Sequence, residues 1–236
     1  MKRVTALVLG ALLLAGCGSE KDSLDNFEQK YSYALGQDIG RSLKNLPMDI
    51  EMEYMFQGVR DALADEQKNL LSDEEMTAVM KEFAVKMQEA QKEKRETAAK
   101  DNEDKGKAFR DENAKKDGVT TTESGLQIET ISEGKGAKPK ATDTVTVHYV
   151  GTLIDGKEFD SSVKRGQPAT FPLTGVIKGW TEGLQLMNVG GKYKLVVPPD
   201  LAYGPNGAGQ LIGPNATLVF EVELISIGQA QAAPGN

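Results

Sequence analysis

Apolar residues in the first half of the chain recur every three or four positions, which is the spacing of one face of an α-helix. One such series runs over residues 24–43, and a second begins near Asp49. Pro47 separates the two, because proline cannot continue a helix at an interior position. We therefore predict two short amphipathic helices. Their apolar positions are Leu24, Phe27, Tyr31, Leu35, Ile39 and Leu43 in the first, and Met52, Met55, Phe56, Val59 and Leu63 in the second.

A third and longer helix is expected over residues 72–117. Ser72 followed by Glu75 forms a capping-box pattern at its start. The first half then carries an apolar seam with alternating steps of four and three residues, as in coiled coils. Residues 92–117 contain nine basic and eight acidic residues, which predict a solvated connecting segment held by ion pairs one turn apart, with Gly106 as a weak point. The seam consists of Met76, Met80, Phe83, Met87 and Ala90.

The apolar faces of these helices have no obvious cover within one chain. Two short helices and half of a long one are too thin to bury a methionine-rich surface. We therefore expect a homodimer that forms through the helical half. The alternative is a small monomeric bundle.

Beyond residue 118 the hydrophobic pattern alternates and is rich in β-branched residues, which indicates strands. One helical stretch, 175–187, lies among them. Antiparallel strands with a single short helix predict an α+β domain of about 110 residues. The strands are expected within 126–132, 143–153, 192–198 and 216–227. In the last of them, Leu218, Phe220, Val222 and Leu224 share one face, and Glu221 and Glu223 point the other way.

The first residues of the chain form a separate segment. Lys2 and Arg3 precede an apolar run that ends at Cys17 and suits the core of a signal peptide, but is too short for a stable membrane span. The sequence "LAGC" resembles the bacterial lipobox, in which the cysteine is lipidated and becomes the mature N-terminus. The alternative is a plain secretory signal with an incidental cysteine. Because Cys17 is the only cysteine, a lipidated chain retains no thiol for a disulfide or a metal site.

The sequence therefore predicts five segments. They are a signal peptide with its lipobox cysteine at 1–17, a helical dimerisation region at 18–71, a long connecting helix at 72–117, the sheet domain at 118–228 and a flexible tail at 229–236.

Composition argues against several functional classes. The net charge of −7 provides no general basic surface for DNA or RNA. A single histidine, with no cysteine in the mature chain, argues against a transition-metal site. The glycine-rich stretch 204–215 lacks the lysine and the strand–loop–helix context of a phosphate-binding loop. We therefore expect no metal, no cofactor and no nucleic-acid partner.

Residues 147–162 look like the components of an acid–base or nucleophilic site. Strand parity, however, places Tyr149 on the inward face and His148 on the outward face. A general base would share a face with the pocket, so we interpret His148 as a surface residue. We expect Ser161 and Ser162 to have no histidine partner, because His148 points outward and the chain has no other histidine. The chain also has no nucleophile-elbow motif. The stretch therefore offers no group for breaking a bond.

The motifs "VHYVGTLIDGKEFDSS", "VIKGW", "DLAYG" and "ATLVFEVELISI", in this order and spacing, resemble the FKBP-type peptidyl-prolyl cis-trans isomerases. The resemblance covers residues 118–227. The helical half and the "TTESGLQ" junction are similar to the macrophage infectivity potentiator (Mip) branch, which joins a helical dimerisation region to an isomerase. The resemblance implies a sheet of five or six antiparallel strands curled around the Trp180 helix. It also implies rotation about X-Pro amides without a metal or a cofactor.

An apolar pocket between the sheet and this helix, which takes the proline ring, is part of what the resemblance implies. The implied catalytic residues are Asp160, Tyr203 and Tyr149, and Arg165 is the implied partner of Asp160. The Ile177 N–H and the Tyr203 hydroxyl would bind substrate carbonyls. From spacing alone, several of the apolar residues would also suit an ordinary core. The implied substrate-binding residues are Phe159, Phe171, Val176, Ile177, Trp180, Ile212 and Phe220.

Two positions depart from the small eukaryotic members of the family. Ala169 stands where those members have a phenylalanine, and Ala208 stands where they often have a histidine. Both changes bear on substrate preference and on the affinity for macrolides such as tacrolimus or rapamycin, which are possible inhibitors, more than on activity.

We expect the protein to accelerate X-Pro rotation in proline-containing unfolded or partly folded proteins of the bacterial cell envelope. The alternative is a periplasmic holdase chaperone, whose helical dimer cleft binds unfolded clients and whose isomerase activity is secondary. A purely structural envelope lipoprotein is a third hypothesis, and the complete set of pocket residues argues against it. In bacterial lipoproteins, the residue after the lipidated cysteine bears on which membrane holds the anchor. Glycine at position 18, in place of aspartate, favours the outer membrane, with the protein facing the periplasm.

Overall fold

The computed structural model describes residues 23–64 and 69–228 of the chain. Cys17 and the expected tail lie outside the described residues. The chain divides into two compact units, residues 1–83 and 84–236, each of which has its own architecture. No helix in the described ranges is long and apolar enough to cross a membrane.

The first unit is helical, as the hydrophobic period predicts. It contains α1 (Phe27–Leu43), α2 (Met52–Leu63) and the start of α3 (Asp73–Asn113). The first helix begins three residues later than the apolar series, because the Asn26 side chain caps it by accepting the Gln29 N–H. The capping box of α3 is confirmed, since Ser72 Oγ accepts the Glu75 N–H while the Ser72 N–H donates to Glu75 Oε2.

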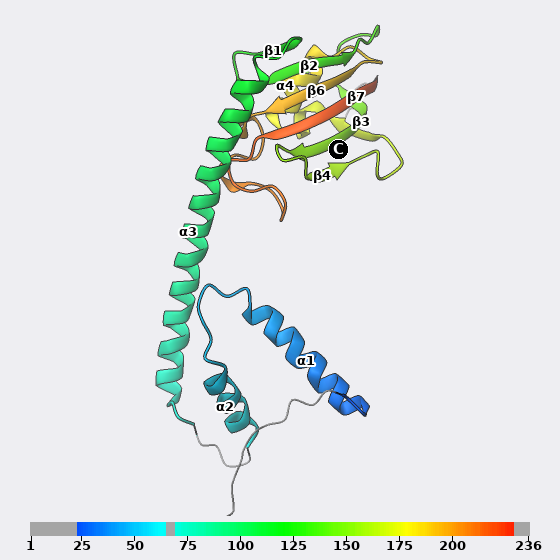
Figure 1. Cartoon of the computed structure of the whole chain (residues 1–236). Helices are drawn as coiled ribbons and strands as arrows, with labels where there is room; N and C mark the ends of the chain where they lie inside the picture. Colours follow the sequence, from blue (N-terminus) through cyan, green and yellow to red (C-terminus); the bar gives the residue numbers. More distant parts are fainter. Residues whose placement is uncertain (1–22, 65–68, 229–236) are drawn as a thin grey trace, which may run out of the picture. The chain divides into compact units, whose positions relative to one another are not determined.

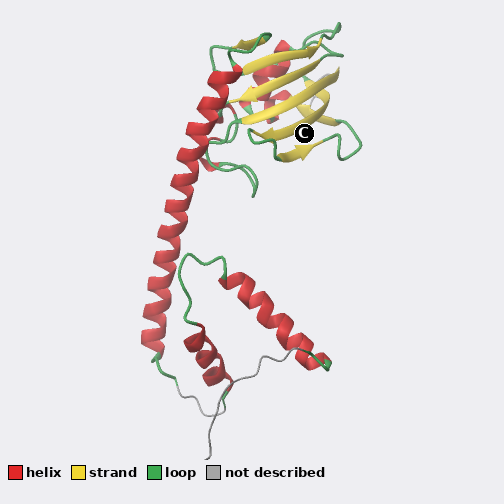
Figure 2. Ribbon diagram, in the orientation of Figure 1, coloured by secondary structure: helices red, strands yellow, loops and turns green. Residues whose placement is uncertain are grey.

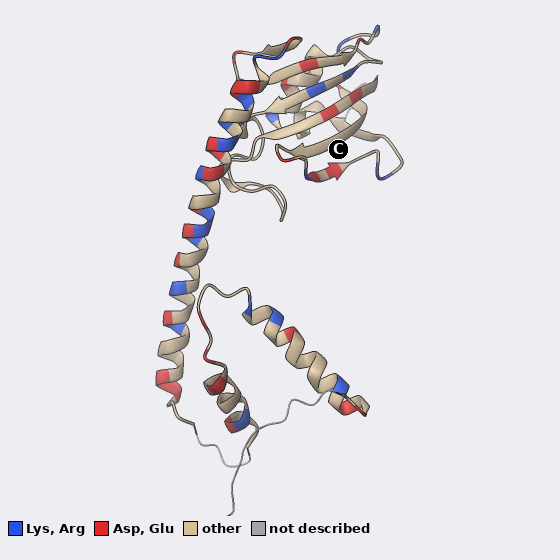
Figure 3. Ribbon diagram, viewed as in Figure 1, with Lys and Arg blue, Asp and Glu red and all other residues tan. Residues whose placement is uncertain are grey.

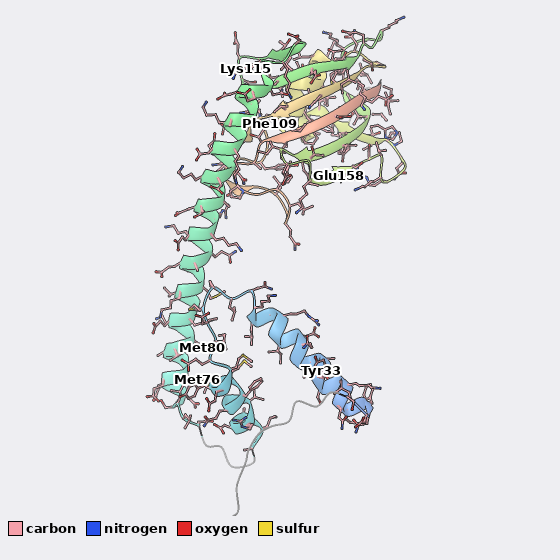
Figure 4. The ribbon with its side chains drawn as sticks, in the orientation of Figure 1. Tyr33, Met76, Met80, Phe109, Lys115 and Glu158 are labelled. Atoms are coloured by element: carbon pink, nitrogen blue, oxygen red, sulfur yellow. The ribbon has the colours of Figure 1, made fainter. Side chains whose placement is uncertain are left out.

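Neither α1 nor α2 contains a buried residue. The described part of α3 before residue 84 contains none either. Figure 4 shows Tyr33 on α1 and Met76 and Met80 on the first turns of α3. These three side chains are 57%, 43% and 57% exposed. The first unit therefore has no core of its own among the described residues.

The second unit contains one antiparallel sheet (Figure 1) in the order β1-β2-β6-β7-β3-β4, with β5 paired to the other end of β3. The predicted α+β architecture is confirmed. The elements are β1 (Val119–Thr121), β2 (Gln127–Ser132), β3 (Thr144–Leu153), β4 (Glu158–Ser161), β5 (Ala169–Pro172), η1 (Leu173–Gly175), α4 (Lys178–Leu186), β6 (Lys192–Val197), η2 (Pro199–Leu201), η3 (Gly204–Asn206) and β7 (Leu218–Gly228).

The core lies between one face of this sheet and α4 (Figure 2). Strand parity is confirmed on β7, where the four apolar positions are buried and the two glutamates are exposed. Two glycines bring the helix close to β6. A Cβ at Gly179 would lie 2.4 Å from Val197 Cγ1, and one at Gly183 would lie 2.9 Å from Leu195 Cδ1. The close approach of α4 fixes Trp180 against the sheet.

The second half of α3 differs from the solvated segment that its charges predict. Gly106 and Asn113 are buried against the sheet domain. A Cβ at Gly106 would lie 2.4 Å from Thr217 Oγ1, so the glycine permits this packing. The Asn113 amide donates to Gln127 Oε1 over 2.9 Å. The helix docks through polar groups, which leave no apolar period in the sequence.

Ion pairs do line the exposed side of α3, as expected. Acidic and basic residues are interspersed along the helix (Figure 3). The pairs four residues apart include Lys100–Asp104, Lys105–Asp101 and Lys107–Asp111. Such exposed pairs contribute little to helix stability, because solvent and salt screen them.

Candidate active site

A pocket of about 430 Å³ opens between the sheet and α4. Nine of the ten residues that the resemblance implies for the pocket line it, and Gly175 lines it as well. The exception is Ile212, which packs half-buried against the core. The lining residues are Tyr149, Phe159, Asp160, Phe171, Gly175, Val176, Ile177, Trp180, Tyr203 and Phe220.

Trp180 lines the pocket and is only 4% exposed. Its ring makes edge-to-face contacts with Tyr149, Phe171 and Phe220, at centroid separations of 5.1, 5.7 and 5.3 Å. Such perpendicular contacts fix ring orientation beyond simple burial. The aromatic side chains therefore form a rigid apolar wall.

Gly151, which was not among the predicted site residues, allows two of these rings to approach the sheet closely. A Cβ at this position would lie 2.7 Å from the Phe159 ring and 2.9 Å from Phe220 Cε1. Both rings occupy the space above the bare backbone of β3 and meet each other edge-to-face at 5.6 Å. A glycine inside a predicted strand was the available signal, because it often marks such a close approach.

A polar cluster closes one side of the pocket. Asp160, on β4, accepts hydrogen bonds from the Tyr149 hydroxyl and from Arg165 Nη1. A second Arg165 nitrogen, Nη2, donates to the Tyr149 hydroxyl over 2.8 Å, so the three groups form a closed triangle. The carboxylate is therefore fixed beside an apolar surface.

This cluster shifts two pKa values in opposite directions. Burial raises the pKa of Asp160, but the hydrogen bonds from Tyr149 and Arg165 outweigh burial and leave that pKa below its ordinary value. Burial, with help from the Asp160 hydrogen bond, raises the pKa of Tyr149 above its ordinary value. At neutral pH the cluster therefore holds one carboxylate, one neutral phenol and one guanidinium.

Two donors at the rim are available to a ligand. The Ile177 N–H, just before α4, has no acceptor among the described residues. The Tyr203 side chain is 42% exposed, and its hydroxyl makes no hydrogen bond within the described part of the chain. Tyr203 directly precedes residues 204–215, here called the flap loop, which carry Ile212.

His148 lies on the outer face of β3, as parity predicts, but the expectation that Ser162 has no histidine partner is wrong. His148 Nδ1 lies 3.1 Å from Ser162 Oγ. The serine hydroxyl is fully buried, accepts the Tyr149 N–H and donates to the Tyr149 carbonyl. It braces the backbone between β3 and the end of β4, and it is not accessible to a substrate.

The described residues contain no group of three or more histidine, cysteine, aspartate or glutamate side chains that could hold a metal ion. The candidate site consists of aromatic walls, two free donors and one fixed carboxylate. Such a site can bind an apolar ring and stabilise a change in the dipole of a nearby carbonyl group.

Two family models match the chain. Residues 135–225 match the FKBP-type peptidyl-prolyl cis-trans isomerase model, and residues 28–129 match the domain amino-terminal to that isomerase. The two matches together span both halves of the chain.

Curated relatives and a solved structure agree with these matches. The FKBP-type isomerase FkpA of Aeromonas hydrophila is 48% identical over 223 residues, which cover 92% of this chain and 82% of that protein. The outer membrane protein MIP of Legionella longbeachae is 43% identical over 98% of this chain and 99% of its own length. The crystal structure of FkpA from Escherichia coli has a TM-score of 0.73 and 47% identity, and covers 88% of this chain and 100% of its own. Since all three similarities extend over most of each chain, this protein belongs to the FKBP-type peptidyl-prolyl cis-trans isomerases.

Proposed function

We propose that the pocket lined by Trp180 is the isomerase site, and that it binds the proline ring of unfolded or partly folded protein chains. The observation that supports this most strongly is the convergence of nine expected residues on one pocket. They come from β3, β4, β5, α4, β7 and the segments that precede α4 and the flap loop.

Rotation about an X-Pro amide has a barrier of about 18–20 kcal/mol and breaks no bond. The twisted amide loses its resonance, and the dipole of its carbonyl group changes. A dry pocket with fixed donors stabilises that state better than water does. In our proposal Trp180 and the phenylalanines hold the ring, and the Ile177 N–H and the Tyr203 hydroxyl bind substrate carbonyls. Asp160 sets the electric field near the rotating bond.

The full chain is expected to isomerise short X-Pro peptides in the presence of a metal chelator, at a rate that varies less than about twofold between pH 5 and 9. The pKa of Asp160 lies below and that of Tyr149 above its ordinary value, so neither group changes its charge in this range. The measurement is kcat/KM at fixed ionic strength. An inflection near pH 6.5, where imidazole ordinarily titrates, would instead indicate a histidine base and contradict the proposal.

Macrolides such as tacrolimus or rapamycin would compete for the same apolar pocket. Ala169 lies on β5 with Phe171. Because alanine stands where the small eukaryotic members have a phenylalanine, Phe171 is the aromatic residue that β5 contributes to the pocket. Competition by a macrolide in the peptide assay would place both ligands at one site.

We further propose that the protein is a lipoprotein of the bacterial outer membrane that faces the periplasm. The "LAGC" sequence and Gly18 support this location. The match to an outer membrane protein along almost the full length of both chains also supports it.

Cys17→Ser is expected to abolish lipidation and to leave an unanchored or unprocessed precursor. The reason is that acyl chains give stable anchoring only when two or more act together, and the lipobox cysteine would carry them. The measurement is membrane fractionation with metabolic labelling by a fatty acid, with Ser19→Ala as the matched control that retains the cysteine. A correctly processed serine variant that stays in the membrane would overturn the lipoprotein proposal.

The helical unit supports a second candidate function, that of a holdase. A groove of about 350 Å³, lined mainly by apolar residues, lies between α1 and α2, and it is lined by Ile39, Leu43, Met52, Met55 and Phe56 among others. Such a surface can bind an unfolded client or a second copy of the chain. We favour the second copy, so that the protein is a homodimer. Sedimentation separates the two hypotheses, since a groove covered by a partner is not free for a client.

A further inference from the structure

The flap loop, residues 204–215, lacks the features that normally fix a loop. None of its residues is buried. It contains four glycines, and those at 204, 207 and 209 have positive φ. Such a segment loses much conformational entropy when it is ordered. Internal hydrogen bonds fold it into a small hairpin, in which Ala208 pairs with Ile212 and the Asn215 N–H donates to the Gly204 carbonyl.

The second half of α3 provides the contacts that hold this hairpin from outside. Arg95 Nη2 donates to the Asn206 side chain over 2.8 Å and to the Pro205 carbonyl over 3.2 Å. Asn102 Nδ2 donates to the Pro214 carbonyl over 2.8 Å. The two contacts hold the first and last turns of the loop on one helix.

A third contact holds the exit from the loop. Arg110, whose side chain is only 16% exposed, donates to Thr217 Oγ1. Gly106 lies one turn earlier and makes room for the same threonine. The Gln127 amide in turn donates to the Arg110 carbonyl over 2.8 Å, which links this part of α3 to β2. The helix is therefore fixed to the sheet domain independently of the loop.

The space behind the loop is not filled by packing. A cavity of about 510 Å³ lies there, lined by Asn102 and Lys105 on α3, by Leu153 at the end of β3 and by Leu211 and Gly213 on the loop itself. Apart from Ile212, which packs half-buried against the core, the loop is held in position by polar contacts. Without them it has both the space and the glycines to move.

We propose that Arg95 and Asn102 are positioning residues of the isomerase, and that α3 holds the flap loop so that Tyr203 and Ile212 stand at the rim of the pocket. This role rests on the proposed site, because it acts through Tyr203. The connecting helix then belongs to the catalytic unit. An isomerase fragment that begins after α3, such as residues 119–236, lacks these contacts and would have a looser loop.

The test compares the full chain with its Arg95→Met/Asn102→Asp variant. Aspartate keeps the size of asparagine but has no N–H to donate to the Pro214 carbonyl. If only a fraction of molecules has the loop in place, apparent affinity falls by that fraction, so we expect KM for an X-Pro peptide to rise about three- to tenfold. The value of kcat should stay within about twofold, since bound substrate selects the ordered loop. Amide hydrogen exchange at Ala208, Ile212 and Asn215 should accelerate, while exchange in β3 and β7 stays unchanged.

Two comparisons make the result specific. The control variant Lys100→Met/Lys107→Met removes two positive charges from the same helix. Both lysines pair with aspartates on α3 and not with the loop, so KM and loop exchange should match the wild type. Arg95→Lys in place of Arg95→Met keeps a donor and should restore part of the affinity. Unchanged loop exchange in the double variant, or faster exchange with unchanged KM, would overturn the proposal. Asp160→Leu in the same assay tests the proposed isomerase site separately. Full activity of that variant would contradict the assigned site and not the positioning role of α3.

Discussion

Replacement of Asp160 by leucine together with Tyr203 by phenylalanine is expected to lower kcat/KM for X-Pro peptides about tenfold or more, which corresponds to at least about 1.4 kcal/mol in the activation free energy. The first change removes the carboxylate that Tyr149 and Arg165 hold at the pocket. The second removes a hydroxyl that has no other partner among the described residues. Both groups are proposed to act on the twisted amide, so the loss should appear in turnover.

The matched control for this experiment is His148→Ala. His148 lies on the opposite face of the same strand and touches Ser162, so turnover should stay within about twofold of the wild type. Trp180 fluorescence and the unfolding midpoint show whether each variant is folded. A folded double variant with full activity would refute the assigned site, and a tenfold loss in the control would mean that the outer face of β3 takes part.

The strands were predictable because burial on one face imprints a period of two on the sequence. Val147 and Tyr149 are buried, as the alternation predicts, whereas His148, which we expected at the surface, is half-buried. The docking of α3 was not predictable in this way. Asn102, Arg110 and their partners meet through hydrogen bonds, so the helix surface that touches the domain looks as polar as the surface that faces solvent. Helix propensity predicts a weak point at Gly106 for the same reason, because it does not include the residues that pack against the glycine.

Most residues of the candidate site were predicted from the family resemblance, because the spacing of apolar residues alone does not distinguish pocket residues from core residues. Trp180 and Phe220 are in fact both, since they line the pocket and are each only 4% exposed. The contact between His148 and Ser162 could not be predicted. It depends on the end of β4 returning alongside β3, a tertiary feature that no local pattern records.

The helical unit is the part of the molecule with the clearest need for a partner. Its described residues include none that is buried. Its apolar side chains, such as Phe27 at 75% and Leu63 at 81%, are among the most exposed apolar side chains that the structure describes. Exposed apolar area of this extent marks an interaction surface. A second copy of the same helices would bury it, and two isomerase domains would then be joined in one molecule. Two pockets could engage two sites on one unfolded client and raise the effective concentration of the second.

Met80→Glu together with Phe83→Glu is therefore expected to convert a dimer into monomers at micromolar concentration, because it would bury two unpaired charges at the seam. The measurement is sedimentation velocity on residues 18–236. Ala78→Glu/Gln88→Glu adds the same charge to α3 outside the seam and should remain dimeric, which separates burial from charge repulsion. The monomers should still turn over short peptides, since each pocket lies within one domain, but should act poorly on a large refolding protein. A wild-type chain that sediments as a single monomeric species would overturn both the dimer and the two-site mechanism, and would leave the apolar helices free for the holdase function.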